Sequence, residues 1–129
     1  MGYFHRWTDF PAHQNLRPRT MRRTVVLDGL TAQRGEMAPD TKFDERSTHR
    51  HPEDQIIVVL EGKLHMRIGS EEKWLEPGEL ATIPGGVYHT AIGVGPEGAA
   101  YVEVLSAGRI DYLPGYAGPP KNEFLHGMP

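Results

Sequence analysis

The chain has 129 residues, a length that fits one domain and allows a hydrophobic core without disulfides. It contains no cysteine, which excludes disulfides, thiolate metal ligands and cysteine nucleophiles. The formal net charge of −3, from 14 basic and 17 acidic residues, gives no reason to expect a nucleic-acid partner. No apolar run approaches membrane-spanning length and the N-terminus lacks the apolar region of a signal peptide, so we expect a cytoplasmic protein without a membrane partner.

The first 23 residues are predicted to form a basic N-terminal arm. Asp9 is the single acidic residue in this segment, which contains Arg6, Arg17, Arg19, Arg22 and Arg23. Such an arm could bind phosphate, but no aromatic residues suited to base stacking are interleaved with the arginines. Packing of the arm against an acidic partner subunit explains the charge equally well.

Residues 24–113 are predicted to form an all-β domain of short strands separated by Gly and Pro turns. The expected strands are 24–27, 30–36, 56–60, 64–68, 73–75, 80–83, 87–92 and 99–105. Turns are expected at 28–29, 61–63, 69–72 and 76–78. About eight or nine short strands at this spacing favour an antiparallel sandwich or barrel over βαβ units.

The strand at 56–60 reads Ile-Ile-Val-Val-Leu and is apolar on both faces. One face is expected to line the barrel interior, and the other needs a second cover. Because a thin barrel has only one interior, we predict a homodimer. A monomer would mean that the N-terminal arm or the C-terminal tail covers the outer face.

Residues 114–129 form a Pro/Gly-rich tail in which seven of sixteen residues are Gly or Pro. Regular structure is not expected there. The tail is predicted to be either an ordered strap over the barrel or a flexible end, and Tyr112, Tyr116 and Phe124 favour the strap.

A candidate metal site begins at His49 and His51, which project from one face of an extended strand. Gln55, four residues after His51, would point to the same face if the strand continued. Histidine pairs at strand spacing are commonly solvated or cross-strand pairs, but a second segment with turn residues ends in His89, which provides a fourth donor from a separate strand. The spacing therefore predicts one bound divalent metal ion, held by His49, His51, Gln55 and His89.

Glu53 shares the parity of these donors and would compete for the metal if Pro52 introduced a bulge. We rank it below Gln55. His65 alternates with an apolar set and is expected on the opposite face, and Tyr88, next to His89, is expected to point away from the metal.

Glu103 is the only charged residue in the apolar segment 99–105. Burying its carboxylate would be costly unless a metal, an arginine or a substrate compensated it, which makes it a candidate catalytic group. The alternative is an outward-facing glutamate on an alternating strand.

These residues resemble the two cupin motifs. The first, GX5HXHX3-4EX6G, is matched by His49, His51, Gln55 and Gly62, with Gln in place of Glu and without the leading glycine. The second, GX5PXGX2HX3N, is matched by Gly78, Pro84, Gly86 and His89, with Gly93 in place of the final Asn. The resemblance covers residues 24–112 and implies a double-stranded β-helix, a small jelly-roll barrel that is commonly dimeric.

The glutamine in the ligand set has a chemical consequence. Three neutral imidazoles and a neutral amide leave the charge of a divalent ion uncompensated, which favours an anionic or oxyanion-forming small-molecule substrate. These donor types permit Zn, Ni, Fe, Mn or Cu.

Among cupins, the chain is similar to the uronate-linearising enzymes of pectin and alginate breakdown, which convert 4,5-unsaturated monouronates to a linear ketonised form. The similarity runs through 49–56, 59–62 and 102–113 and includes glutamine as a ligand. It implies a catalytic acid/base at Glu103, where that family has aspartate, and a catalytic arginine at Arg109. The extra methylene of Glu103 changes where the proton-transfer group would sit.

Three functions remain open at this point. The first is a metal-dependent isomerase, tautomerase or lyase in which Glu103 moves a proton. The second is an oxygen-dependent dioxygenase with the same ligands. The third is a non-catalytic ligand-binding or sensory cupin.

Overall fold

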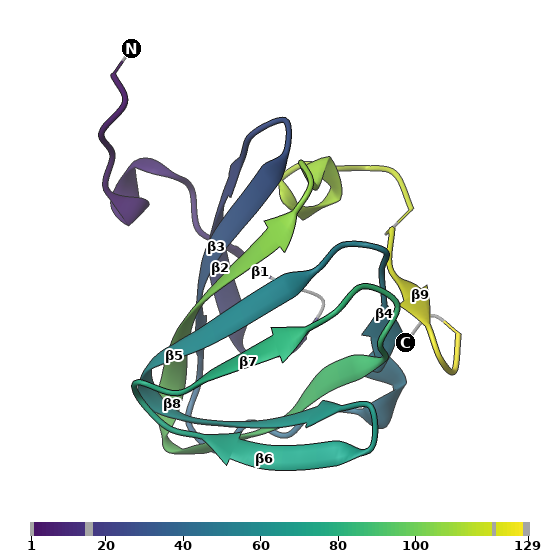
Figure 1. The fold of residues 1–129 in the computed structure, drawn as a ribbon. Helices are drawn as coiled ribbons and strands as arrows, with labels where there is room; N and C mark the ends of the chain where they lie inside the picture. The colour runs from purple at the N-terminus through teal and green to yellow at the C-terminus, as the bar shows by residue number, and fades with distance from the viewer. Residues whose placement is uncertain (1, 15–16, 120, 128–129) are drawn as a thin grey trace.

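The computed structural model describes residues 2–14, 17–119 and 121–127, which form one curled antiparallel sheet (Figure 1). The strands in these residues are β1 (His13–Gln14), β2 (Thr20–Val26), β3 (Leu30–Met37), β4 (His49–Arg50), β5 (Gln55–Ile68), β6 (Glu71–Leu75), β7 (Leu80–Ile83), β8 (His89–Ser106) and β9 (Glu123–Phe124). Three single-turn 3-10 helices, η1 (Trp7–Asp9), η2 (Glu45–Ser47) and η3 (Ile110–Tyr112), complete the described elements. Within these residues, no helix has the length and apolar character needed to cross a membrane.

The two longest strands, β5 and β8, pair with each other along most of their length. The predicted turn at 61–63 and the predicted break between 92 and 99 are therefore wrong. Gly62 has a φ of +72°, and the register of the β5–β8 pairing shifts on both sides of it. The sequence at 61–63 therefore forms bulges in a continuing strand and not a turn. A Cβ at Gly62 would lie 1.8 Å from the carbonyl oxygen of Gly98, so only glycine allows the two backbones to approach this closely.

The sheet closes into a barrel because β5 and β8 bend and contribute to both of its walls (Figure 1). The strand order β1-β2-β3-β8-β4-β9 forms one path, and β5 pairs with β6, β7 and β8 beside it. Consequently the part of β8 near Glu103 lies between β3 and β5. Side chains from three strands can therefore meet in the barrel interior.

Strand parity decides which side chains enter the core. Ile57 and Val59 of β5 are buried, whereas Ile56 and Leu60 are exposed on the outer face. Tyr101 and Leu105 of β8 are buried with the same two-residue period. The predicted all-β class and the inner and outer faces of 56–60 are thus confirmed.

The two ends of the chain both contribute to the barrel mouth. β2 begins at Thr20, inside the segment predicted as an arm, and pairs with β1 and β3. In the tail, β9 pairs with β4, so the expectation that 114–129 lacks regular structure is wrong at Glu123–Phe124. The backbone N–H of Leu125 also donates to the carbonyl oxygen of Thr48. Of the two alternatives predicted for the tail, the described residues therefore form the ordered strap.

Candidate metal centre and cavity

Three histidines meet at the barrel mouth. His49 on β4 lies directly opposite His89 on β8, and His51 follows two residues after His49. One ring nitrogen from each lies within 4.8 Å of the others, and all three side chains are buried. The prediction that 49–55 forms a single extended strand is wrong, because β4 ends at Arg50 and β5 begins only at Gln55.

Backbone carbonyls orient all three imidazole rings. The Nδ1 atoms of His49, His51 and His89 lie 2.7, 3.0 and 2.9 Å from the carbonyl oxygens of residues 47, 53 and 87. A carbonyl oxygen can only accept, so each Nδ1 must carry the hydrogen. Each Nε2 is then a lone-pair donor, which is the form that binds a metal.

Two further observations show that these residues fit a metal ion. His89 Nε2 is buried and has no hydrogen-bond partner among the described residues. His51 Nε2 lies 3.0 Å from the Oε1 atom of Gln55, so two acceptors face each other without a hydrogen between them. A cation shared by these atoms satisfies all of them, and the three histidines together can hold one metal ion.

His49 and His89 are neutral at ordinary pH. Burial and the nearby Arg17 charge lower the pKa of His49 from 6.5 to about 2. Burial lowers the pKa of His89 to about 4. Protons therefore do not compete with a metal at these two nitrogens near pH 7.

Glu103 faces the barrel interior next to the histidine cluster, as the catalytic prediction requires. The Nε2 atom of Gln55 donates to Glu103 Oε2 at 2.5 Å, and Gln33 Nε2 donates to Oε1. Burial raises the pKa of Glu103, although the charges of Arg22 and Arg17 oppose the rise. The same contact orients Gln55, because an amide whose nitrogen points to Glu103 presents its oxygen to His51.

Gln33 is a site residue that the sequence analysis missed. It lies opposite Glu103 in the β3–β8 register, and Thr24 Oγ1 donates to its Oε1 atom at 2.9 Å. This fixes the Gln33 amide with its nitrogen toward Glu103. The alternation of side chains along the strand could have indicated it. Gln33 lies between outward-facing Ala32 and Arg34, so it is a polar residue on the core side of its strand.

A cavity of about 480 Å³ opens beside the histidines and Glu103, a volume typical of small-molecule sites. Its apolar wall comes from the barrel core. The N-terminal segment contributes His13, Arg17 and Arg22, and the C-terminal strap contributes residues 111–116, Gly118, Asn122 and Phe124. The arginines of the N-terminal segment are the second group that the sequence analysis did not assign to the site.

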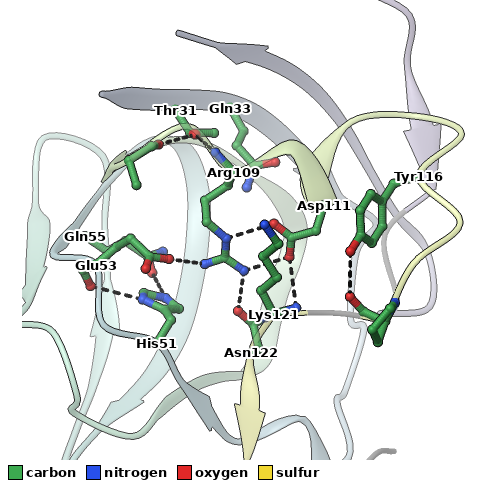
Figure 2. Close-up of polar contacts among 12 residues, drawn as sticks. Thr31, Gln33, His51, Glu53, Gln55, Arg109, Asp111, Tyr116, Lys121 and Asn122 are labelled. Carbon is green, nitrogen blue, oxygen red and sulfur yellow. Dashed lines mark hydrogen bonds and ion pairs between the residues drawn. The ribbon is translucent and has the colours of Figure 1, made fainter. Parts of the chain in front are cut away.

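Arg109, the other predicted catalytic residue, is buried among protein acceptors (Figure 2). Its Nε and Nη2 atoms donate to both carboxylate oxygens of Asp111 at 2.8 and 2.7 Å. Nη1 donates to Glu53 at 2.5 Å and Nη2 to Asn122 at 2.8 Å. These contacts tie the start of β5 to the strap, and Arg109 is not among the residues that line the cavity.

The remaining candidates occupy structural positions. The Glu53 carboxylate pairs with Arg109, and only the backbone carbonyl of Glu53 contacts a histidine, His51. His65 stacks on Trp74 with ring centroids 4.6 Å apart, away from the cluster. Tyr88 lies under the guanidinium of Arg50 at 4.7 Å. The lower rank given to Glu53 as a metal ligand, and the predicted placement of His65 and Tyr88 away from the metal, agree with these contacts.

Solved structures of other proteins share this architecture. An RmlC-like cupin from Shewanella frigidimarina NCIMB 400 aligns with a TM-score of 0.74 and 20% identity over 88% of this chain and 97% of its own. KdgF from Halomonas sp. aligns with a TM-score of 0.73 and 23% identity over 88% and 100%. A single-residue variant of oxalate decarboxylase from Bacillus subtilis aligns with a TM-score of 0.66 and 20% identity over 79% of this chain, which spans only 28% of that protein.

A search of curated protein sequences gave no match. The family model for the cupin domain matches residues 34–105, which is more than half of the chain. The match includes all four predicted ligands and Glu103. Together with the barrel topology, it shows that the chain belongs to the cupin family.

Proposed function

We propose that this cupin is a metal-dependent enzyme that isomerises a small anionic sugar acid, with a 4,5-unsaturated monouronate as the best candidate. The observation that supports this proposal most directly is the contact between Glu103 and Gln55. It places one carboxylate of raised pKa beside the histidine cluster, inside a cavity large enough for a monosaccharide. The fold shared with KdgF and the sequence resemblance to uronate-linearising cupins support the same substrate class.

In this proposal His49, His51, His89 and Gln55 hold one divalent ion. When bound, the ion supplies a Lewis acid that polarises a substrate oxygen. Each histidine is held in one tautomer by its carbonyl contact, and Gln55 is held by Glu103. The ligand geometry is thus fixed before the substrate arrives.

Glu103 moves the proton. In ring opening, it takes the hydrogen of the C1 hydroxyl, the bond between C1 and the ring oxygen breaks, and its electron pair stays on that oxygen as an enolate. A proton then adds to C4, the enolate becomes the C5 ketone, and an aldehyde remains at C1. One proton leaves and one returns, so the reaction is an isomerisation that needs no co-reactant. The raised pKa of Glu103 suits a carboxyl that alternately carries and releases a proton.

The test follows the loss of the ring form of the unsaturated uronate by NMR, with oxygen excluded. General acid/base assistance is worth about a hundred- to ten-thousand-fold, so Glu103→Gln is expected to lower turnover by that order while metal content stays the same. Glu97→Gln, an exposed glutamate on the same strand, is the matched control and is expected to behave as wild type.

A wild-type protein that gives no rate above background would contradict the proposal. If it instead consumes oxygen with an enediol or flavonol, a dioxygenase function replaces it. If it binds uronate without any turnover, a non-catalytic binding function replaces it.

A further inference from the structure

We propose that Arg17 and Arg22 form a carboxylate-binding subsite in the cavity, which holds the acid group of the substrate while its other oxygens face the histidine cluster and Glu103. The inference deepens the proposed function and rests on it for the substrate class. Both arginines come from the N-terminal segment and line the cavity that contains His49, Gln55 and Glu103.

Arg17 has donor atoms that no described residue uses. Its Nη2 donates to Thr90 Oγ1 at 3.3 Å, and its guanidinium lies 5.7 Å from the ring centroid of Phe43. Its Nε is buried and has no hydrogen-bond partner among the described residues. A buried guanidinium N–H without an acceptor is costly, and an acceptor brought by a ligand removes that cost.

Arg22 is held in place by contacts that leave its outer nitrogens available. Nε donates to His13 Nε2 at 3.0 Å, and the guanidinium lies 4.7 Å from the ring centroid of Tyr112. These contacts fix the plane of the guanidinium. Among the described residues, no hydrogen bond involves its Nη1 or Nη2, which are the pair of donors that a carboxylate accepts side by side.

The charges around the two arginines also favour an anion in the cavity, although both already stabilise the charged form of Glu103 at longer range. Several other arginines pair with a carboxylate within 4 Å, namely Arg34, Arg50, Arg67 and Arg109. In the described part of the chain, neither Arg17 nor Arg22 does so. Glu103 is engaged by two glutamine amides, and Asp111 on the same cavity wall is engaged by Arg109. Two positive charges thus face the cavity without a paired carboxylate.

Their placement suits a ligand that spans the cavity. Arg17 contacts Thr90, the residue after His89, so its charge lies beside the histidine cluster. Arg22 stacks on Tyr112 in η3, at the start of the strap. Both arginines line the same cavity as Glu103.

The experiment measures binding of galacturonate and galactose to the metal-loaded protein by titration calorimetry. Galacturonate lacks the C4–C5 double bond and cannot react, and galactose differs from it by the carboxylate. We expect wild type to bind galacturonate at least about tenfold more tightly than galactose. Arg17→Gln and Arg22→Gln are each expected to weaken galacturonate binding about tenfold or more, the usual effect of losing a hydrogen bond to a charged group, without changing galactose binding.

Arg19→Gln is the matched control, because Arg19 is an exposed arginine of the same segment, and it is expected to match wild type. Arg17→Lys keeps the charge but not the fork of donors and should fall between wild type and Arg17→Gln. Metal content and the thermal midpoint of each variant show whether its fold is retained.

Equal affinity of wild type for the two sugars would overturn the subsite, as would full galacturonate affinity in folded Arg17→Gln and Arg22→Gln. An arginine-dependent preference for galacturonate, combined with no turnover of the unsaturated uronate, would leave the subsite standing and refute the proposed reaction.

Discussion

At the scale of single residues, the site depends on which way two glutamine amides point. Thr24 fixes Gln33, and Gln33 and Gln55 both donate to Glu103. The carboxylate is therefore held from two sides, while the Gln55 oxygen is left for the histidine cluster. Thr24, Gln33 and Gln55 thus set the position of the Glu103 carboxylate, the proposed proton-transfer group.

Gln33→Ala tests this arrangement. The lost donor stabilises the charged carboxylate, so its removal is expected to raise the pKa of Glu103 further. The acidic limb of the kcat/KM profile, where the base becomes protonated, should move to higher pH. Turnover should fall about 10- to 100-fold, as for other residues that orient a catalytic group, with unchanged metal content.

Arg34→Ala serves as the control for Gln33→Ala, because Arg34 is the next residue and pairs with Glu36 on the outer face. A loss of turnover in Gln33→Ala with an unshifted pH profile would mean that Gln33 has only a structural role.

The residue scale also shows what local sequence can predict. His49, His51, Gln55 and His89 could be found because turn residues and parity are encoded close to them. Alternation along the strand places Gln33 on the core side, but its contact with Glu103, seventy positions away, could not be predicted from local sequence. That contact exists only once β3 and β8 are neighbours.

At the scale of elements, the strap and the start of β5 are joined by Arg109. Its guanidinium is buried and contacts Glu53, Asp111 and Asn122. The salt bridges raise the pKa of Arg109 against the opposing effect of burial, so it stays charged. Its predicted catalytic role stays a prediction, which a stability measurement can separate from a structural one.

Arg109→Ala is expected to lower the free energy of unfolding by about 3–5 kcal/mol, because it leaves buried carboxylates without a partner. Denaturant titration measures this. Arg50→Ala removes a half-exposed arginine that pairs with Glu123 on the same strap and is expected to change stability little. Unchanged stability with abolished turnover in Arg109→Ala would instead support the direct catalytic role.

The bounds of the elements were harder to predict than their faces. A Glu-Gly-Lys sequence looks the same in a turn as in a bulge, and only the pairing of β5 with β8 makes it a bulge. Similarly, His49, His51 and Gln55 lie close together as predicted, although they do not belong to one continuous strand. Convergence there depends on the bend at residues 51–54, which parity alone does not describe.

At the scale of the whole molecule, the barrel leaves an apolar outer face on β5 and β7. Ile56, Leu60 and Leu80 are 46%, 42% and 53% exposed there. Neither the described N-terminal residues nor the strap pairs with this side of the sheet. The homodimer predicted from the sequence would cover it.

Light scattering is expected to give twice the chain mass of 14.4 kDa. Leu80→Glu should shift the protein to monomers by placing a charge in the buried interface. Leu27→Glu changes another exposed leucine, at the β2–β3 turn, and should remain dimeric. A wild-type monomer at micromolar concentration would refute the dimer.

The central claim is that one divalent ion is held by the histidine cluster and Gln55. Elemental analysis of protein purified without chelator tests it most directly. The account predicts about one metal ion per wild-type chain, the same content in His65→Ala, and almost none in the double variant His51→Ala, His89→Ala. Metal retained by a folded double variant, or absent from wild type supplied with divalent metals, would contradict it.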